Sequence, residues 1–477
     1  MTPNQYTPEE PISSIATALA PAALGIVRVS GKGCIELVSK VFSRPKALLE
    51  AAGNTLVYGW ILDSLQADSK IDEVMLAVYR APKSFTGEDM VEIFCHGGPA
   101  VVMAVQNLML RSGFRQANRG EYTFRAFING KTDLTKAEAV KEIIDSHTDV
   151  SRSHAAGRLA GSLFEEIDSI KKLIIDTLAA IEVEIEYPED EETIADSFDR
   201  EDIETAVKRL QALVDSWKGE KLYQDGARVV LAGRTNAGKS SLFNAILKEE
   251  RAIVSDIEGT TRDWLESWAS INGIPVRLFD TAGLRETSDV IEAQGVEISR
   301  SLVHDADVVL YLVDSQSGLN DEDREFIDKC EEPLIVVFTK IDCHAELVSA
   351  STSGSRNEFG MTFKDGTEII PISSKTGTGL AELFSKIYSI LTAGIAGGAG
   401  NTTERTQAGL GSARQKEAVA AALESVKHAL VSADDNYTLD AVVQDLEDAL
   451  DSLGEVTGDV TPDDVLGSIF ANFCVGK

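Results

Sequence analysis

The sequence predicts a multidomain protein of mixed class: an N-terminal α+β domain, an all-α helical domain, and an α/β domain inserted into the helical domain. Three observations support this prediction. The 477 residues are enough for about three domains at roughly 150 residues each. The pattern changes from short strands to a helical period at Leu134. Between residues 228 and 392 strand and helix patterns alternate, and a helical period then returns.

The first 130 residues show β-branched or alternating runs that end at Gly or Pro. These runs lie at residues 26–31, 73–82 and 91–98, and such patterns are typical of strands. We therefore expect strands with short helices and set this domain at residues 1–131.

The helical period is clearest in an apolar series with a 4-4-3-4-4-3 spacing, which predicts one long helix with a single apolar stripe that ends near Pro188. Its members are Leu159, Leu163, Ile167, Ile170, Ile174, Leu178 and Ile181. Residues 419–453 repeat this pattern. Neither half has many partners of its own, so we expect residues 132–224 and 393–477 to pack together as one helical domain.

Residues 225–392 form the predicted inserted α/β domain. Its strands read RVVLAG, PVRLFD, ADVVLYLVD, PLIVVFTK and EIIPIS, and such near-continuous apolar runs are expected of a parallel sheet that is buried on both faces. The Ser-rich stretch 344–362 is expected to be an exposed loop, and the Gly-rich stretch 394–403 a linker.

Composition limits the function classes. Lys and Arg total 45 against 77 Asp and Glu, a net charge of −32, and such a field excludes a general nucleic-acid coat protein. Five cysteines form no CxxC pair, which favours free thiols in a reducing compartment. No secretory signal pattern and no run of about 18 apolar residues is present. We therefore expect a cytoplasmic protein without a membrane segment.

The segment GRTNAGKSS (233–241) follows a predicted strand and precedes a predicted helix. This is the G-x-x-x-x-G-K-S phosphate loop in its required context. Gly233 and Gly238 permit the tight wrap, Lys239 is expected to reach the outer phosphates, and Ser240 to bind Mg²⁺.

Downstream segments point to a guanine nucleotide. Asp280 in DTAG ends a strand and can reach Mg²⁺ through water, while the Gly283 N–H can meet the γ-phosphate. The carboxylate of Asp342 in TKID can accept from both N1–H and the 2-amino group of guanine. SSK (373–375) is the loop expected behind the base, and DIEGTTRD (256–263) is the expected switch segment.

The usual water-orienting Gln is replaced by Leu284, and no internal arginine finger is evident. Two substitutes are open at this point. Asn236 could offer its amide oxygen to a monovalent cation, or it could only stabilise the loop. Glu292 could activate the attacking water, or it could be a solvated helix carboxylate.

These segments together resemble those of a known family. N-A-G-K-S-S, G-T-T-R-D and D-T-A-G-L-R-E resemble the TrmE–Era–EngA class of P-loop GTPases. Residues 86–101, residues 120–140 and the C-terminal CVGK are similar to the MnmE (TrmE) family of tRNA-modification GTPases.

The resemblance implies a potassium-dependent GTP hydrolase that works as a homodimer. With the flavoprotein MnmG (GidA), in a heterotetramer or larger complex, it would modify carbon 5 of the wobble uridine of certain tRNAs. An aminomethyl or carboxymethylaminomethyl group would be installed from a reduced folate, such as 5-formyl-tetrahydrofolate, as one-carbon donor.

The resemblance also implies site residues. Folate contacts fall on Arg28, Glu92, Lys131 and Lys477, which makes residues 1–131 a folate-binding and dimerisation domain. Potassium falls on Asn236, Ser255, Ile257 and Thr260, Mg²⁺ on Ser240 and Thr261, and the general base on Glu292; Asn236 and Lys239 complete the expected catalytic set. The residues expected around GTP are Asn236, Ala237, Gly238, Lys239, Ser240, Ser241, Ser255, Asp256, Ile257, Glu258, Gly259, Thr260, Thr261, Asp280, Thr281, Ala282, Gly283, Thr339, Lys340, Asp342, Ser373, Ser374 and Lys375.

Two positions depart from the family pattern. Thr235 stands where Pro is common, and Thr339 stands where the guanine segment usually begins with Asn. The alternative is an RNA-binding switch of the Era or EngA type without transferase chemistry. It needs a basic RNA-binding module, for which the chain offers only Arg111, Arg115, Arg119 and Arg125.

Overall fold

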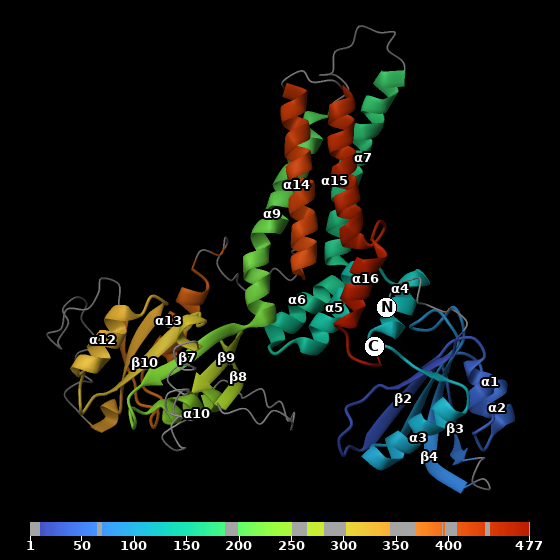
Figure 1. Ribbon diagram of the computed structural model, residues 1–477, viewed down its shortest axis with the longest axis horizontal. Coiled ribbons are helices and arrows are strands. Elements are labelled where there is room, and N and C mark those ends of the chain that lie inside the picture. Colours follow the sequence, from blue (N-terminus) through green and yellow to red (C-terminus); the bar gives the residue numbers. More distant parts are fainter. Residues whose placement is uncertain are drawn as a thin grey trace. The chain divides into compact units, whose positions relative to one another are not determined.

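The computed structural model describes residues 10–63, 69–186, 199–249, 265–280, 302–343, 368–393, 395, 408–434 and 439–476. The chain forms two compact units (Figure 1). The first comprises Met1–Lys141, Arg158–Leu210 and Glu417–Lys477, and the second Glu142–Gly157 and Gln211–Lys416. Each unit is therefore built from segments that are far apart in the sequence.

The first unit contains a six-stranded sheet with the order β3-β4-β5-β2-β1-β6. All neighbours pair antiparallel except β1 and β6, which are parallel. The strands are β1 (Ile12–Ile15), β2 (Leu24–Ser30), β3 (Thr55–Asp63), β4 (Ser69–Tyr79), β5 (Met90–His96) and β6 (Arg115–Gln116). The three strands predicted from the sequence are confirmed as β2, β4 and β5.

Three helices pack on one face of this sheet and form its core: α1 (Cys34–Ser39), α2 (Pro45–Leu49) and α3 (Pro99–Arg111). Because side chains alternate along a strand, β5 places Val91, Ile93 and Cys95 in this core. The alternate residues Glu92, Phe94 and His96 point to the opposite face.

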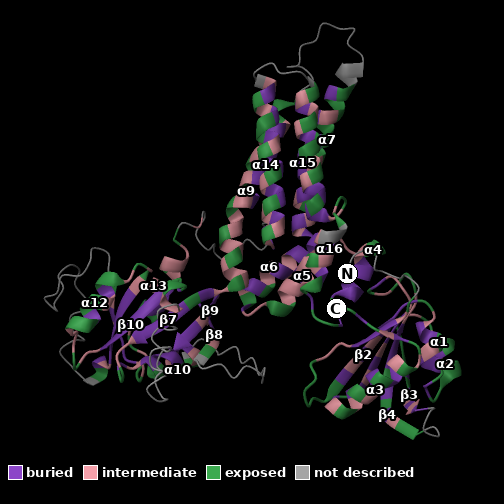
Figure 2. Ribbon diagram, in the orientation of Figure 1, coloured by how far each residue is buried: buried purple, intermediate pink, exposed green. Residues whose placement is uncertain are grey.

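In the described part of the chain, the opposite face of the sheet carries apolar side chains that are exposed. Figure 2 colours the ribbon by the burial of each residue. Leu24 and Leu56 are 60% and 61% exposed, and Tyr58 and Met75 are also exposed. A monomer rarely leaves such a surface in water without a function.

Helices make up the remainder of the first unit and link it to the second. They are α4 (Glu121–Ile128), α5 (Leu134–Asp145), α6 (Asp149–Ala160), α7 (Ser162–Glu186), α9 (Arg200–Asp225), α14 (Ala413–Asp434), α15 (Leu439–Thr457) and α16 (Asp463–Ala471). Within the first unit α7 packs on α15, with Ile167, Ile170, Ile174 and Ile181 of α7 buried. Segments that lie on the two sides of the α/β domain in the sequence therefore pack on each other in the first unit.

The prediction of one continuous helix from Leu159 to Ile181 is wrong at its start. Gly161 has φ +113, a conformation that interrupts a helix, and separates α6 from α7. Leu159 therefore leaves the apolar stripe and is exposed. α7 ends at Glu186, close to the predicted end.

The second unit contains the α/β domain, whose sheet order is β12-β11-β10-β7-β9-β8. The strands are β7 (Ala227–Gly233), β8 (Leu265–Ile271), β9 (Ile274–Asp280), β10 (Val308–Asp314), β11 (Leu334–Thr339) and β12 (Glu368–Pro371), and the helices are α10 (Lys239–Glu249), α12 (Asp321–Lys329) and α13 (Leu380–Leu391). The five predicted strands are confirmed and parallel. The sequence reading missed β8, an antiparallel edge strand.

Among the described helices, none is both long enough and apolar enough to cross a membrane. Cys34, Cys95, Cys330 and Cys474 are free thiols, and the first two are buried. This confirms the prediction for Cys34, Cys95 and Cys330.

Candidate functional site

The phosphate loop lies at the carboxyl end of β7, between the carboxyl ends of β10 and β9. Strand order reverses at this point, which is where open α/β sheets bind ligands. Gly233 has φ +133, and a Cβ there would lie 2.4 Å from the carbonyl oxygen of Leu312. The close approach of β10 therefore requires glycine at this position.

The charged and hydroxyl groups of the loop are already oriented. The Lys239 ammonium is almost fully buried and donates to the carbonyl oxygens of Gly233 at 2.7 Å and Arg234 at 2.8 Å. The Ser240 hydroxyl donates to Asp280 at 2.8 Å. A hydroxyl and a carboxylate side by side suit Mg²⁺, which prefers oxygen ligands. These two oxygens form the part of the predicted Mg²⁺ site that the structure describes.

The guanine segment holds the phosphate loop. The Thr339 hydroxyl is buried and donates to the carbonyl oxygen of Ala237 at 2.7 Å. Lys340 donates to the carbonyl oxygen of Asn236 at 2.9 Å and pairs with Asp314 at 2.6 Å. The hydrogen bond from Lys340 lowers the pKa of Asp314. Thr339 therefore faces the phosphate loop. Its hydroxyl makes a hydrogen bond there that the amide of the usual Asn could also make.

Asn236 has the left-handed φ of +64, and its side chain is exposed. Asparagine tolerates this conformation better than most residues. Ala237 is buried behind it, while Ser241 is exposed in the first turn of α10.

Sequence reasoning missed a second anchor of the loop. Arg234 pairs with Asp323 at 3.1 Å, and only 1% of the Asp323 side chain is exposed. Asp323 also accepts from the Tyr311 hydroxyl at 2.7 Å. Burial and this bond raise the pKa of Tyr311. The sequence signal that could have indicated this anchor is the spacing of Asn320 and Asp323, which form a capping box at the start of α12.

The predicted base-recognition residues lie together. The Ser373 hydroxyl donates to Asp342 at 2.8 Å and is buried, whereas the Asp342 side chain is exposed. Ser374 and Lys375 follow in the same turn, and Lys375 is exposed. A carboxylate held by a buried serine can accept from the N–H edge of guanine.

Twelve predicted site residues lie outside the described part of the chain: Ser255, Asp256, Ile257, Glu258, Gly259, Thr260, Thr261, Thr281, Ala282, Gly283, Glu292 and Lys477. Among the described residues, no group of three or more His, Cys, Asp or Glu side chains could hold a metal ion.

In the N-terminal unit the structure brings Arg28 and Glu92 together. They face each other across β2 and β5, with Arg28 donating to Glu92 at 2.7 and 2.9 Å. Arg28 also donates to the carbonyl oxygen of Gly476 at 2.9 Å. Gly476 is thus held at this pair.

Two tyrosines that sequence reasoning did not select complete these contacts. The Tyr122 hydroxyl donates to the carbonyl oxygen of Arg28 at 2.7 Å, and its ring lies 5.5 Å from the guanidinium. Tyr79 donates to Glu92 at 3.4 Å. Tyr122 lies inside the motif-rich stretch 120–140, which is the signal that could have identified it.

Lys131 lies at a neighbouring loop and donates to the carbonyl oxygen of Pro82 at 3.0 Å. Its contacts do not include Arg28 or Glu92 in the described hydrogen bonds and ion pairs.

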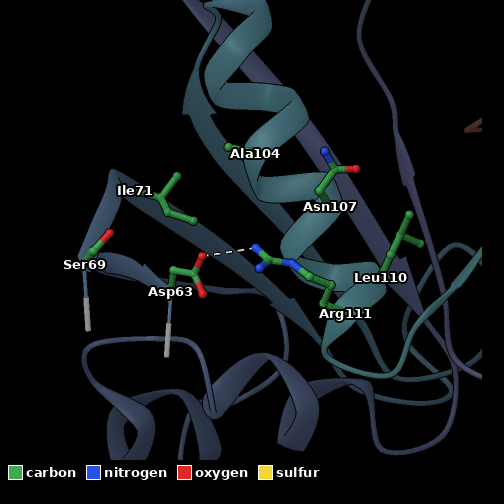
Figure 3. Close-up of a pocket in the computed structure, with 7 residues that line it drawn as sticks. All are labelled: Asp63, Ser69, Ile71, Ala104, Asn107, Leu110 and Arg111. Carbon is green, nitrogen blue, oxygen red and sulfur yellow. Dashed lines mark hydrogen bonds and ion pairs between the residues drawn. The ribbon is translucent and has the colours of Figure 1, made fainter. Parts of the chain in front are cut away.

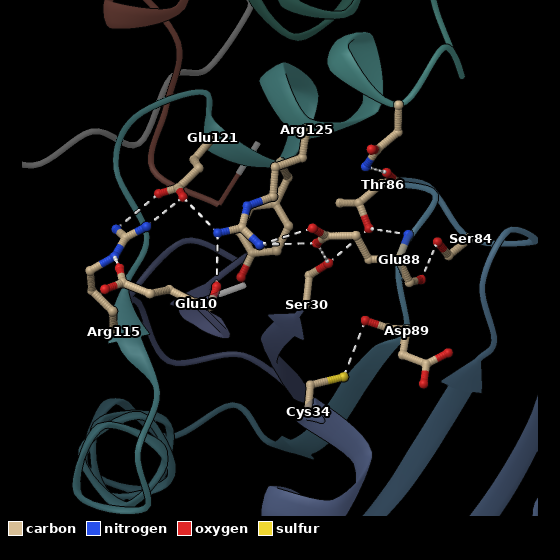
Figure 4. A network of polar contacts seen from close by, with 12 residues as sticks. Glu10, Ser30, Cys34, Ser84, Thr86, Glu88, Asp89, Arg115, Glu121 and Arg125 are labelled. Carbon is tan, nitrogen blue, oxygen red and sulfur yellow. Dashed lines mark hydrogen bonds and ion pairs between the residues drawn. The ribbon is translucent and has the colours of Figure 1, made fainter. Parts of the chain in front are cut away.

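The arginines considered for RNA binding are largely engaged within the domain. Arg125 is fully buried and pairs with Glu88 and Glu121, and Arg115 pairs with Glu121 (Figure 4). Arg111 pairs with Asp63 at 3.1 Å beside a hollow of about 630 Å³ between α3 and the ends of β3 and β4 (Figure 3). Of the four, Arg111 and Arg119 are exposed, and Arg111 is paired with a carboxylate, so the four do not form one basic surface.

This fold and its phosphate loop define a P-loop nucleotide-binding protein. Two family models match the chain: the GTP-binding protein TrmE N-terminus over residues 11–131 and the MnmE helical domain over residues 134–474.

Named relatives match over almost the whole length. The tRNA modification GTPase MnmE of Treponema denticola is 51% identical, covering 99% of this chain and 99% of that protein. The MnmE of Carboxydothermus hydrogenoformans is 41% identical, covering 98% of this chain and 100% of that protein. A crystal structure of Aquifex aeolicus Era with GDP and aluminium fluoride is 27% identical over 42% of this chain and 66% of that one, with a TM-score of 0.28. The chain belongs to the MnmE (TrmE) family.

Proposed function

We propose that this chain is a GTP hydrolase that acts in tRNA modification. The observation that carries the proposal is the phosphate loop, in which Lys239 and the Ser240–Asp280 pair are set at the carboxyl edge of the sheet. The family relationship adds the substrate class, since relatives at up to 51% identity are named tRNA modification GTPases.

The chemistry of the site follows from charge. Lys239 would exchange its two carbonyl partners for phosphate oxygens, and the loop N–H groups would hold the same phosphates. Bound Mg²⁺ would offset charge on the transferring phosphoryl group. Asp342 would select guanine through its N–H edge.

We further propose that hydrolysis depends on potassium. Asn236 stands in the loop with its side chain exposed and its backbone held by Lys340. An amide oxygen there can join oxygens of Ser255, Ile257 and Thr260 around a monovalent cation, and Glu292 would act as the general base. A cation at this point would do the work of an arginine finger.

For the N-terminal unit we propose binding of a reduced folate, such as 5-formyl-tetrahydrofolate, at Arg28, Glu92, Lys131 and Lys477. A folate has a carboxylate tail that suits Arg or Lys and a pterin edge that suits a carboxylate. The Arg28–Glu92 pair beside Gly476 offers both chemistries in one place.

The proposed assembly is a homodimer that works with MnmG on the wobble uridine of tRNA in the cytoplasm. The uncovered apolar sheet face at Leu24, Leu56, Tyr58 and Met75 supports a dimer through the N-terminal domain. The net charge of −32 favours a partner that supplies much of the tRNA affinity.

We propose domain boundaries at 131/132, 224/225 and 392/393.

The decisive experiment compares GTP turnover of the full chain in KCl and in NaCl. We expect substantially faster turnover in KCl, because sodium is smaller than a cage of such oxygens. Asn236→Ala should abolish the potassium effect and spare GDP affinity, while Asn244→Ala, at an exposed position on α10, should retain it. Equal rates in the two salts would remove the potassium part, and absence of GTP turnover in both would remove the proposed activity.

A further inference from the structure

The loop that joins β4 to β5, residues 80–89, forms the platform under Lys131. The Lys131 ammonium donates to the carbonyl oxygen of Pro82. Gly87 has φ +79, and a Cβ there would lie 3.2 Å from Cγ of Lys131 and 3.1 Å from Cβ of Asn129. Asn129 in turn donates to the carbonyl oxygen of Thr86 at 2.7 Å. The Lys131 side chain therefore passes close to Gly87 and donates its hydrogen bond to this loop.

Glu88 ties the same loop to a fully buried guanidinium. It accepts from Nη1 of Arg125 at 3.0 and 3.2 Å, and none of the Arg125 side chain is exposed. Burial works against the charge of Arg125, but the carboxylates of Glu88 and Glu121 outweigh it and raise the pKa of Arg125. Arg125 stays charged, so the pair holds firmly.

Glu88 also reaches the strand that carries Arg28. The buried Ser30 hydroxyl donates to Glu88 at 2.8 Å and lies 2.7 Å from the Thr86 hydroxyl (Figure 4). Ser30 and Arg28 are two residues apart on β2, so their side chains lie on the same face of the sheet. One carboxylate thus joins the platform of Lys131 to the strand of Arg28.

Helix α4 completes the connection from the other side. Tyr122 of this helix donates to the carbonyl oxygen of Arg28, Arg125 donates to Glu88, and Lys131 follows the end of the helix. Helix α4, strand β2 and the loop 80–89 are thus joined pairwise by hydrogen bonds. We call these three connected elements the frame of the proposed folate residues.

From this frame we infer that Glu88 and Arg125 are positioning residues that fix Lys131 relative to the Arg28–Glu92 pair for binding of a reduced folate. The inference rests on the proposed folate site. Neither residue needs to touch the ligand. Glu88 and Arg125 act through distance: they set how far Lys131 lies from the Arg28–Glu92 pair. That distance decides how well one rigid folate molecule can contact both.

The test is calorimetry of 5-formyl-tetrahydrofolate with the full-length chain. Glu88→Gln keeps the size of the side chain and removes its charge. We expect about tenfold weaker binding, as is typical when a group that orients a binding residue is altered, with unchanged GDP affinity. Asp63→Asn is the matched control, because it removes the carboxylate partner of Arg111 in the same domain and should leave folate affinity as in the parent.

A double-mutant cycle shows whether Glu88 acts through Lys131. If it does, Glu88→Gln combined with Lys131→Ala should bind no more weakly than Lys131→Ala alone. Additive losses, or parent-like affinity of a folded Glu88→Gln, would overturn the inference. If Glu88→Gln does not fold, Ser30→Ala provides the same test, since it removes the hydroxyl that joins Glu88 to β2. A parent chain that binds no folate contradicts the proposed site itself, which is a different result.

Discussion

The two candidate sites hold their charged groups in different ways. In the N-terminal unit, side chains pair with side chains: Arg28 with Glu92, and Arg125 with Glu88 and Glu121. At the phosphate loop, Lys239 is held by two backbone carbonyl oxygens. The first arrangement joins opposite charges, whereas the second holds a cation through neutral backbone oxygens.

This difference has a consequence for ligand binding. A phosphate can replace the two carbonyl oxygens at Lys239 without leaving a charge unpaired at either of them. A ligand that displaced Arg28 from Glu92 would leave that carboxylate, which is 13% exposed, without its cation, and such a loss is costly. The N-terminal site therefore favours a ligand that contacts the pair while it stays formed.

The largest effect on activity is expected when Lys239 is replaced. Lys239→Ala should reduce GTP turnover by a factor on the order of 10²–10³, because a preorganised cation at the transferring phosphate is lost. The thermal unfolding midpoint should change little, since the freed carbonyl oxygens can accept other hydrogen bonds. Steady-state phosphate release and a melting curve measure the two effects.

Lys248→Ala is the control for this variant, because Lys248 is an exposed lysine at the other end of α10. Retention of turnover in Lys239→Ala, or a large loss of stability, would mean that the backbone-held lysine is structural.

A smaller effect, on nucleotide binding, is expected when Asp342 is replaced. This residue of the α/β domain is held by a side-chain hydrogen bond. Its carboxylate accepts from Ser373 and faces no cation in the described ion pairs. Asp342→Asn should weaken GTP binding by roughly 10- to 100-fold, the cost of losing hydrogen bonds to a charged group. Binding of xanthosine triphosphate should improve, because an amide can donate to its 2-oxo group.

Competition binding with GTP, ATP and xanthosine triphosphate measures this preference. Asp328→Asn, at an exposed position on α12, should behave as the parent. Similar affinity of the parent for ATP and GTP would contradict the assignment of Asp342.

Much of the α/β domain was predictable because its signals are local. Buried parallel strands read as apolar runs, and the loop from Gly233 to Ser240 is contiguous in the sequence. The antiparallel strand β8, LESWASI, has no such run. The residues next to Arg234 in the sequence do not indicate its ion-pair partner, because Asp323 lies far along the chain.

The N-terminal site was less predictable for the same physical reason. Arg28 and Glu92 are 64 residues apart, and Arg28 and Gly476 are 448 residues apart, so only folding brings them together. Arg125 illustrates the limit most clearly. An isolated arginine in an acidic chain suggests a surface group, yet this one is fully buried because Glu88 and Glu121 surround it.

The smallest expected effect concerns a partly exposed pair of the N-terminal unit, in which the side chain of His96 is 68% exposed and that of Asp72 11%. The His96 Nδ1 lies 2.7 Å from Asp72, and the hydrogen bond and charge of this carboxylate raise the pKa of His96 above 6.5. Since the folded pKa is raised, the stabilisation is complete below about 6.5 and is lost as pH rises through the folded value.

This pair joins side chain to side chain like Arg28–Glu92, but its cationic partner, His96, lies in solvent. Proton NMR of the six histidines should show one signal that disappears in His96→Gln and titrates above pH 6.5 in the parent. The parent should also melt slightly above His96→Gln at pH 6, and the two should converge at pH 8.5. The size of the gap should be small, because water screens the charge of the exposed imidazolium. A gap that is the same at both pH values would show that His96 acts through packing, and that burial is not what separates the strong pairs of this unit from the weak one.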